Sequence, residues 1–149
     1  MLGAFAHVGI TVRDMDRAVH FYRDVLGLKV VGDMTFGGEE ADALTQEKGT
    51  QLRAVYLRSV EEPKGAPIEL LHFISPVAEG KPYAGIKNPG ITEVAFWVKD
   101  IEKSYTDLRA QGVQFYSPPQ LFDFDGYKAK AVYFRDPDGT TLELIQRVK

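Results

Sequence analysis

Cysteine is absent from this chain of 149 residues, and its absence excludes several kinds of site. Without thiols the protein has no disulfide bond, no thiolate metal centre and no cysteine nucleophile. No apolar run approaches the roughly 20 residues needed to cross a bilayer, so we expect no membrane segment. The opening stretch, MLGAFAHV, lacks a basic start followed by a long apolar core, so we expect no signal peptide.

An excess of charge of one sign is also lacking. The net charge is −3, with acidic and basic residues mixed along the chain, which is unlike the polybasic surface of a nucleic-acid-binding protein. Hydrophobic residues make up 44% and charged residues 26% of the chain, as in ordinary globular domains. We therefore expect a cytoplasmic protein that acts on a small molecule and binds neither nucleic acid nor a membrane.

What the chain does contain is an internal repeat. Three segments return in the same order with similar letters, which indicates a duplicated module. The matches are RAVYLR at 53–58 with KAVYFR at 130–135, IELLH at 68–72 with LELIQ at 142–146, and VRDMDRA at 12–18 with VKDIEKS at 98–104. We predict one domain over 1–149, built from modules at 4–74 and 90–147 that are joined by a linker at 75–89, rich in proline and glycine.

Each module predicts the order β-α-β-β-β. In the first module we expect strands at 5–12, 28–36, 51–58 and 68–74, a helix between Asp14 or Asp16 and Gly27, and a polar loop at 37–49 with at most a helical turn. In the second we expect strands at 91–98, 113–116, 128–135 and 141–146, a helix between Asp100 and Gly112, and an aromatic and acidic loop at 122–127. This order predicts an α+β fold in which two tandem βαβββ modules form a curled, mostly antiparallel sheet around a cleft.

Alternation along the strands predicts what lines that cleft. Val8, Ile10 and Val12 suit a face covered by the helix, which sends His7 to the opposite face. The same reasoning places Glu69, Glu93 and Glu143 on that opposite face. If the two sheets join and curl, the four side chains converge. A carboxylate flanked by apolar neighbours, as in IELL and LELI, is costly to bury without a partner, and a divalent cation would be such a partner.

Several stretches resemble the vicinal oxygen chelate superfamily, which includes glyoxalase I, methylmalonyl-CoA epimerase, extradiol dioxygenases, and fosfomycin and bleomycin resistance proteins. The resemblance covers nearly the whole chain, and its most specific pieces are FYRDVLGLKV and DPDG followed by LEL. It implies paired βαβββ modules around a divalent metal, usually in a homodimer. Matched position by position, it implies the metal ligands His7, Glu69, Glu93 and Glu143.

The chain departs from the family pattern at Glu93, where glyoxalase-like and epimerase-like members most often carry histidine. One imidazole and three carboxylates favour a harder cation, such as Mn²⁺, Mg²⁺ or Ca²⁺, over the nitrogen-rich sites of zinc or nickel. Three ionised glutamates exceed the charge of a dication, so one carboxylate is left to act as a base. By family analogy this catalytic group is Glu143, with Glu93 as the other candidate.

The resemblance implies a lyase or isomerase of the glyoxalase or epimerase type, which acts on a small oxygenated substrate through an enolate-like intermediate. One alternative is a binding protein without catalytic activity, whose cleft would be lined by aromatic side chains (Trp97, Phe73, Tyr127 and Tyr133). A third, weaker option is an extradiol dioxygenase, whose iron site uses two histidines and one carboxylate. Of the three histidines, only His7 is well placed for that role.

We expect the other polar residues to have simpler roles. We expect His72 to be structural and His20 to be solvated on the first helix. Arg53 and Lys130 are equivalent in the repeat, and they either lie on a solvated face or contact an anionic substrate. The FDFDGY segment at 122–127 is either a lid over the cleft or a turn with aromatic packing, and DPDG at 136–139 predicts a tight turn.

Overall fold

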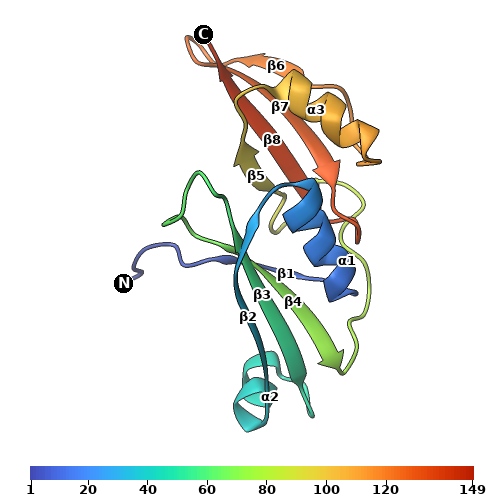
Figure 1. The fold of residues 1–149 in the computed structure, drawn as a ribbon. Helices are drawn as coiled ribbons and strands as arrows, with labels where there is room; N and C mark the ends of the chain where they lie inside the picture. Colours follow the sequence, from blue (N-terminus) through green and yellow to red (C-terminus); the bar gives the residue numbers. More distant parts are fainter. The chain divides into compact units, whose positions relative to one another are not determined.

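The computed structural model describes all 149 residues, and the chain divides into two units, Met1–Gly80 and Lys81–Lys149 (Figure 1). The boundary falls within the segment 75–89. On one side of it, the Arg13 guanidinium donates to the carbonyl oxygen of Ala78 at 3.2 Å. On the other side, Arg135 Nη2 donates to the carbonyl oxygen of Ala84 at 2.9 Å. Each part of the segment is thus tied to its own unit.

The first unit is built on a four-stranded sheet in the order β1-β4-β3-β2. β1 and β4 are parallel, and the other two pairs are antiparallel. The elements in chain order are β1 (Val8–Thr11), α1 (Met15–Val19), the π-helix η1 (His20–Val25), β2 (Lys29–Gly37), α2 (Glu39–Thr45), β3 (Gln51–Arg58) and β4 (Ile68–Ser75).

The second unit repeats this topology, in the order β5-β8-β7-β6 with β5 parallel to β8. Its elements are β5 (Val94–Trp97), α3 (Ile101–Ala110), β6 (Gln120–Asp123), β7 (Lys128–Arg135) and β8 (Thr141–Val148). The predicted α+β class is confirmed: the chain forms two mixed four-stranded sheets, neither of them closed. The second unit has the βαβββ order, and the first has the same order with α2 added between β2 and β3. None of the helices is both long and apolar enough to cross a membrane.

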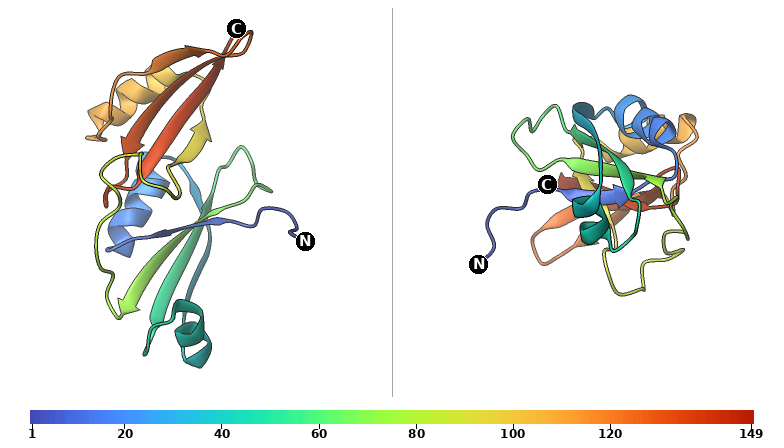
Figure 2. Two further views of the ribbon diagram at one scale, coloured as in Figure 1. Left: turned by 180° about the vertical axis from the view of Figure 1, so that it is seen from behind. Right: turned by 90° about the horizontal axis from the view of Figure 1, so that it is seen from below.

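In each unit a helix covers one face of the sheet (Figures 1 and 2). The alternating residues of the strands supply the core beneath it, because every second side chain points to the same face. In the first unit this core joins Met15, Ala18 and Tyr22 to the fully or nearly fully buried strand residues Val55, Leu57, Ile68 and Leu70. In the second unit it joins Ile101 and Leu108 to Val132, Phe134, Leu142 and Leu144.

Two predictions for the first unit need correction. The expected single helix after Asp14 changes its hydrogen bonding at His20 and continues as a π-helix, in which Leu26 N–H donates to the carbonyl of Phe21, five residues earlier. The polar segment 37–49 is more ordered than expected, because it contains α2. There the Asp42 carboxylate accepts from the backbone N–H groups of Gly49 and Thr50, which closes the segment on itself.

The predicted strand at 113–116 is wrong. Only Phe115 pairs there, in an isolated bridge with Phe134, and the edge strand is β6 at Gln120–Asp123. Pro118 and Pro119 explain the shift, because proline has no N–H to donate to a ladder and the strand can only begin after them. The segment 122–127, expected to be a loop, is therefore partly strand.

The first strand of each module is shorter than predicted. β1 begins at Val8 and β5 at Val94, because these residues pair with Ile68 and Leu142, the first and second residues of their partner strands. His7 and Glu93 consequently lie one residue before their strands. The two residues occupy equivalent positions in the two modules.

The helix caps are the local contacts most open to a stability test. Asp100 accepts from the N–H of Lys103 at 3.0 Å at the start of α3. We predict that Asp100→Ala lowers the free energy of unfolding by about 1 kcal/mol, or a fall in Tm of roughly 2–4 °C. Asp107→Ala, on the same helix, loses only an exposed pair with Lys103 and should cost no more than a few tenths of that. Equal losses for both variants in denaturant unfolding would contradict the prediction.

Candidate functional site

The register of the parallel pairs places the predicted site residues. Gly9 pairs with Glu69 in the first unit, and Ala95 pairs with Glu143 in the second. Each glutamate therefore lies on the sheet face opposite the helix. Its ladder partner, Gly9 or Ala95, stands two residues after His7 or Glu93 in the chain. The structure brings His7 together with Glu69, and Glu93 close enough to Glu143 for the two charges to interact.

In the first unit both carboxylate oxygens of Glu69 have a neighbour. His7 Nε2 lies 3.2 Å from Oε2, and the Tyr56 hydroxyl donates to Oε1 at 2.7 Å. Tyr56 is directly opposite Glu69 in the β3–β4 ladder. Gly9 leaves room for the group, since a Cβ at this position would lie 3.3 Å from Oε2. Glu69 is thus fixed by its neighbours, with 14% of its side chain exposed against 41% for His7.

The hydrogen bond to Glu69 changes the acidity of Tyr56. The bonded carboxylate, with burial and its charge as smaller causes, raises the pKa of Tyr56 to about 12. The phenol, already protonated at physiological pH at its ordinary value of 10.0, keeps its proton further into the alkaline range. It acts as a fixed hydrogen-bond donor that orients Glu69.

The second unit places two carboxylates where the first has a histidine and a carboxylate. Burial, and then the charge of Glu93, raise the pKa of the Glu143 carboxyl. Glu93 Oε2 is buried and has no hydrogen-bond partner. Tyr133 is opposite Glu143 in the β7–β8 ladder, and its pKa is raised by burial and by the charges of both glutamates. A buried carboxylate oxygen without a donor is costly, and a cation between these groups would reverse that cost.

Each unit by itself supplies a pair of candidate ligands. No group of three or more histidine, cysteine, aspartate or glutamate side chains is placed to hold a metal ion. The oxygen-rich donors fit a divalent cation in their chemistry, since Glu93 Oε2 has an unused acceptor and the Glu93–Glu143 pair carries uncompensated negative charge.

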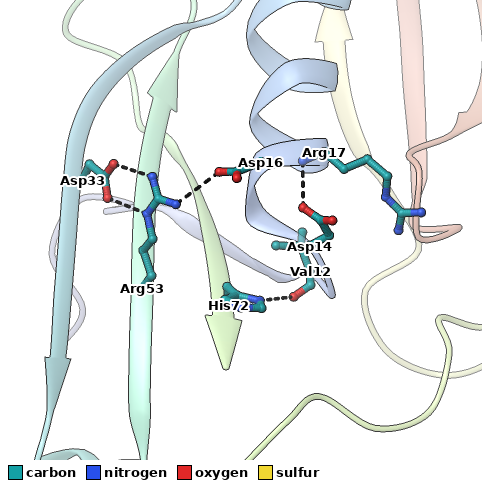
Figure 3. A network of polar contacts seen from close by, with 7 residues as sticks. All are labelled: Val12, Asp14, Asp16, Arg17, Asp33, Arg53 and His72. Atoms are coloured by element: carbon teal, nitrogen blue, oxygen red, sulfur yellow. Dashed lines mark hydrogen bonds and ion pairs between the residues drawn. The ribbon is translucent and has the colours of Figure 1, made fainter. Parts of the chain in front are cut away.

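Most of the other polar residues considered for the site belong to the framework (Figure 3). Arg53 donates to both carboxylate oxygens of Asp33, at 3.0 and 2.8 Å, and to Asp16 at 3.4 Å. Its counterpart Lys130 donates to Glu102 on α3 at 2.6 Å. The structure therefore favours a structural role for both side chains over contact with a substrate. Each joins its strand, β3 or β7, to neighbouring elements.

The histidines outside the site are also accounted for. His72 Nδ1 lies 3.3 Å from the carbonyl oxygen of Val12, in agreement with a structural role. In the repeat its place is taken by Gln146, whose side chain accepts from the N–H of Ile101 at 2.8 Å. The side chain of His20 is 67% exposed and pairs with Asp24 one helical turn later. It is solvated, as expected.

The sequence interpretation missed Tyr56. Its signal was present in the repeat, because RAVYLR and KAVYFR carry tyrosine at the same place. Once the antiparallel register is known, both tyrosines fall opposite a site glutamate. A search for polar residues at equivalent repeat positions would have singled out the two tyrosines, but not the glutamates opposite them.

The acidity of Tyr56 can be tested by ultraviolet titration of the seven tyrosines. We predict that the native protein has one phenol that ionises near pH 12 and that Tyr56→Phe removes it. Glu69→Gln should return that phenol towards the ordinary value of 10.0, because the bonded charge is lost. Tyr105→Phe on α3 is the control and should leave the highest transition in place. Retention of that transition in Tyr56→Phe would refute the assignment.

Comparison with known proteins agrees with the fold. The sequence model of the Glyoxalase/Bleomycin resistance protein/Dioxygenase superfamily matches residues 4–144. The chain is 31% identical over 155 residues to an ethylmalonyl-CoA/methylmalonyl-CoA epimerase of Cereibacter sphaeroides, covering 98% of this chain and 99% of that protein.

Two further relatives extend the comparison. The chain is 28% identical over 146 residues to a lactoylglutathione lyase of Schizosaccharomyces pombe, covering 95% of this chain and 46% of the yeast protein. A crystal structure of a glyoxalase family protein from Bacillus cereus has the same fold, with a TM-score of 0.84 at 21% identity, covering 100% of this chain and 97% of that one. The family match spans nearly the whole chain, and the chain therefore belongs to the Glyoxalase/Bleomycin resistance protein/Dioxygenase superfamily.

Proposed function

We propose that the protein is a divalent-metal-dependent lyase or isomerase of the glyoxalase or epimerase type. The observation that carries the proposal is the Glu93–Glu143 pair, in which a buried oxygen without a hydrogen-bond partner lies near a carboxyl of raised pKa. Relatives named as an epimerase and as a lactoylglutathione lyase support an activity of this kind. A homodimer and a small oxygenated substrate, as the family resemblance implies, are part of the proposal.

The proposed metal ligands are His7, Glu69, Glu93 and Glu143. The excess of carboxylate favours a harder cation, such as Mn²⁺, Mg²⁺ or Ca²⁺, over Zn²⁺, Ni²⁺ or Fe²⁺. When bound, such a cation supplies Lewis-acid stabilisation of the negative charge that develops on a substrate oxygen. The Tyr56 hydroxyl holds Glu69 in position through its 2.7 Å hydrogen bond, as a partner behind a ligand does in many metal sites.

Glu143 is the proposed proton carrier. Its partial burial and the nearby Glu93 charge favour the protonated carboxyl, which brings its pKa closer to the working pH of a general acid–base group. In this role the Glu143 carboxylate takes the proton from the carbon next to the substrate carbonyl and returns it. Glu93 is the second candidate for this step, since Oε2 has no other bond to break.

A binding protein without catalytic activity is the second candidate. Exposed aromatic side chains on the second unit, with Trp97 at 62% and Tyr127 at 40% exposure, favour it. Metal dependence separates the two functions, because sequestration of an apolar ligand does not need a Lewis acid.

Metal binding gives the first test. Protein purified without an affinity tag, incubated with Mn²⁺ and freed of excess ion should retain the metal in stoichiometric amount by elemental analysis. His7→Ala and Glu143→Gln should weaken binding by at least the roughly 10–100-fold that loss of an outer-shell partner costs. His20→Ala and Glu102→Gln, on the helices, are matched controls. A native protein that binds no divalent ion at micromolar concentration would overturn the proposal.

The charge pair also predicts a pH dependence. Because the folded-state pKa of Glu143 is raised above 4.5, metal-free protein should lose stability as the pH rises from about 4.5 through the raised value. Glu143→Gln should remove that loss, so that it unfolds a few degrees above the native protein at neutral pH in EDTA. Added Mn²⁺ should stabilise the native protein more than this variant, which binds the ion more weakly. Denaturation scans across pH check both effects, and identical profiles for the two proteins would contradict the origin assigned to the shift.

Catalysis is tested by proton exchange. In deuterated water, the metal-loaded protein should exchange the α-proton of a methylmalonyl thioester or of a hemithioacetal, followed by NMR. Glu143→Gln should abolish the exchange, and Glu102→Gln should retain it. Exchange that persists undiminished in Glu143→Gln would remove this residue from its proposed role.

A further inference from the structure

The sheet face that carries Glu143 continues into a surface that the proposed chemistry does not use. Moving away from Glu143, the next residues of β8 on this face are Ile145 and Arg147. Ladder pairing places Ala131 and Trp97 beside Ile145. The last row across the sheet runs from Phe122 through Ala129 to Arg147. Small alanines therefore form the middle of the face, between larger side chains.

Arg147 carries an uncommitted positive charge on this face. Its guanidinium carbon lies 5.2 Å from the centroid of the Trp97 ring and 5.5 Å from that of Tyr127. No hydrogen bond or ion pair to another protein group involves its N–H donors. The rings hold the cation by its π contacts, which leaves the planar N–H groups available for a bidentate bond to a carboxylate or phosphate.

Aromatic rings extend the same surface towards the edge strand. Phe122 and Phe124 are stacked, with centroids 5.8 Å apart and planes inclined by 11°, and Phe124 lies 6.1 Å from Tyr127. All three are exposed, as is Trp97. A continuous exposed patch of rings around one unpaired cation is the mark of a binding surface.

Two of the neighbouring acidic residues, Asp123 and Glu143, do not cancel this charge. Asp123 and Lys128 are partners in the ladder, with Asp123 Oδ2 and Lys128 Nζ 3.7 Å apart. Alternation places both on the opposite face from Phe122 and Arg147. Arg147 and Glu143 share a face and are four residues apart on one strand, a separation of about 13 Å at roughly 3.3 Å per residue.

We propose that this surface, formed by Arg147, Trp97, Tyr127, Phe122 and Phe124, binds the distal part of a substrate that carries an anionic group and an aromatic or apolar segment. The anion pairs with Arg147, and the apolar segment lies on the rings over Ala129 and Ala131. The location of the reacting end at Glu143 rests on the function proposed above. The occupant is a small anion rather than a second copy of the chain, because the centre of the patch is an unpaired cation.

The test compares a matched pair of small probes, 4-phenylbutyrate and the neutral 4-phenylbutan-1-ol. Trp97 is the only tryptophan of the chain, so its single indole N–H resonance reports binding directly. In EDTA-treated protein, the anion should shift this resonance saturably and bind about fivefold more tightly than the alcohol, the preference expected from one partly exposed charge pair. Arg147→Gln should abolish the preference, and Arg147→Lys should retain part of it.

Arg109→Gln is the matched control. The Arg109 guanidinium carbon lies 5.3 Å from the centroid of the Tyr105 ring on α3. The variant therefore removes the same type of contact on the opposite side of the sheet, and it should leave the preference for the anion intact. Equal affinities for the two probes, or an unchanged preference in Arg147→Gln, would overturn the proposal. An indole shift that follows protein concentration instead of probe concentration would also overturn it, because a second copy would then cover the face.

The design separates this surface from the proposed metal chemistry. The probes are titrated without metal, so their binding does not depend on the ligand residues, and Glu143→Gln should leave the preference for the anion intact. If the protein binds no divalent ion but prefers the anion through Arg147, the proposed surface stands and the proposed function is overturned. If the protein binds the metal but shows no preference for the anion, the proposed function stands and the proposed surface is overturned.

Discussion

The parallel pairing between the first and last strands of each module is the constraint on which the rest of the structure depends. Val8 is paired with Ile68, and Val94 with Leu142, in the same register. Since strand side chains alternate between faces, that register sends the apolar residues under the helix and turns Glu69 and Glu143 to the other face. A slip by one residue would bury both carboxylates beneath a helix, at a large cost in unfolding free energy.

Within this shared frame, one residue sets the electrostatic difference between the units. His7 lies 3.2 Å from Glu69 and offers it a neutral or positive ring, whereas Glu93 places a second negative charge near Glu143. Tyrosine hydroxyl groups accompany both glutamates, but a hydrogen bond joins only Tyr56 to its carboxylate. The first pair is therefore satisfied by its own neighbours. The second has a negative charge and an acceptor left over.

The sequence predicted those parts of the fold in which local pattern and tertiary environment agree. β3 and β7 have the predicted bounds, 51–58 and 128–135, because both stretches are rich in residues that favour strands and share the repeated letters AVY. The prediction failed at 113–123, where two prolines delay the strand and no alternation marks its start. Tyr56 was missed for a different reason. Its role depends on the residue across the ladder, and cross-strand partners cannot be identified before the register is known.

The same dependence on register explains why Arg147 attracts no attention in the sequence, where it stands in a short polar C-terminal stretch. Its position acquires meaning only because β8 also carries Glu143 four residues earlier on the same face. Two groups on one strand are held at a nearly fixed separation, since the β7–β8 ladder pairs every residue from Thr141 to Val148. The distance between the proposed reacting group and the proposed anion-binding cation is thus set by the sheet. The rings of Phe124 and Tyr127, which lie beyond the strands, are freer to adapt. A substrate selected by this face would accordingly need a fixed length between its two polar ends, while the shape of its apolar middle could vary.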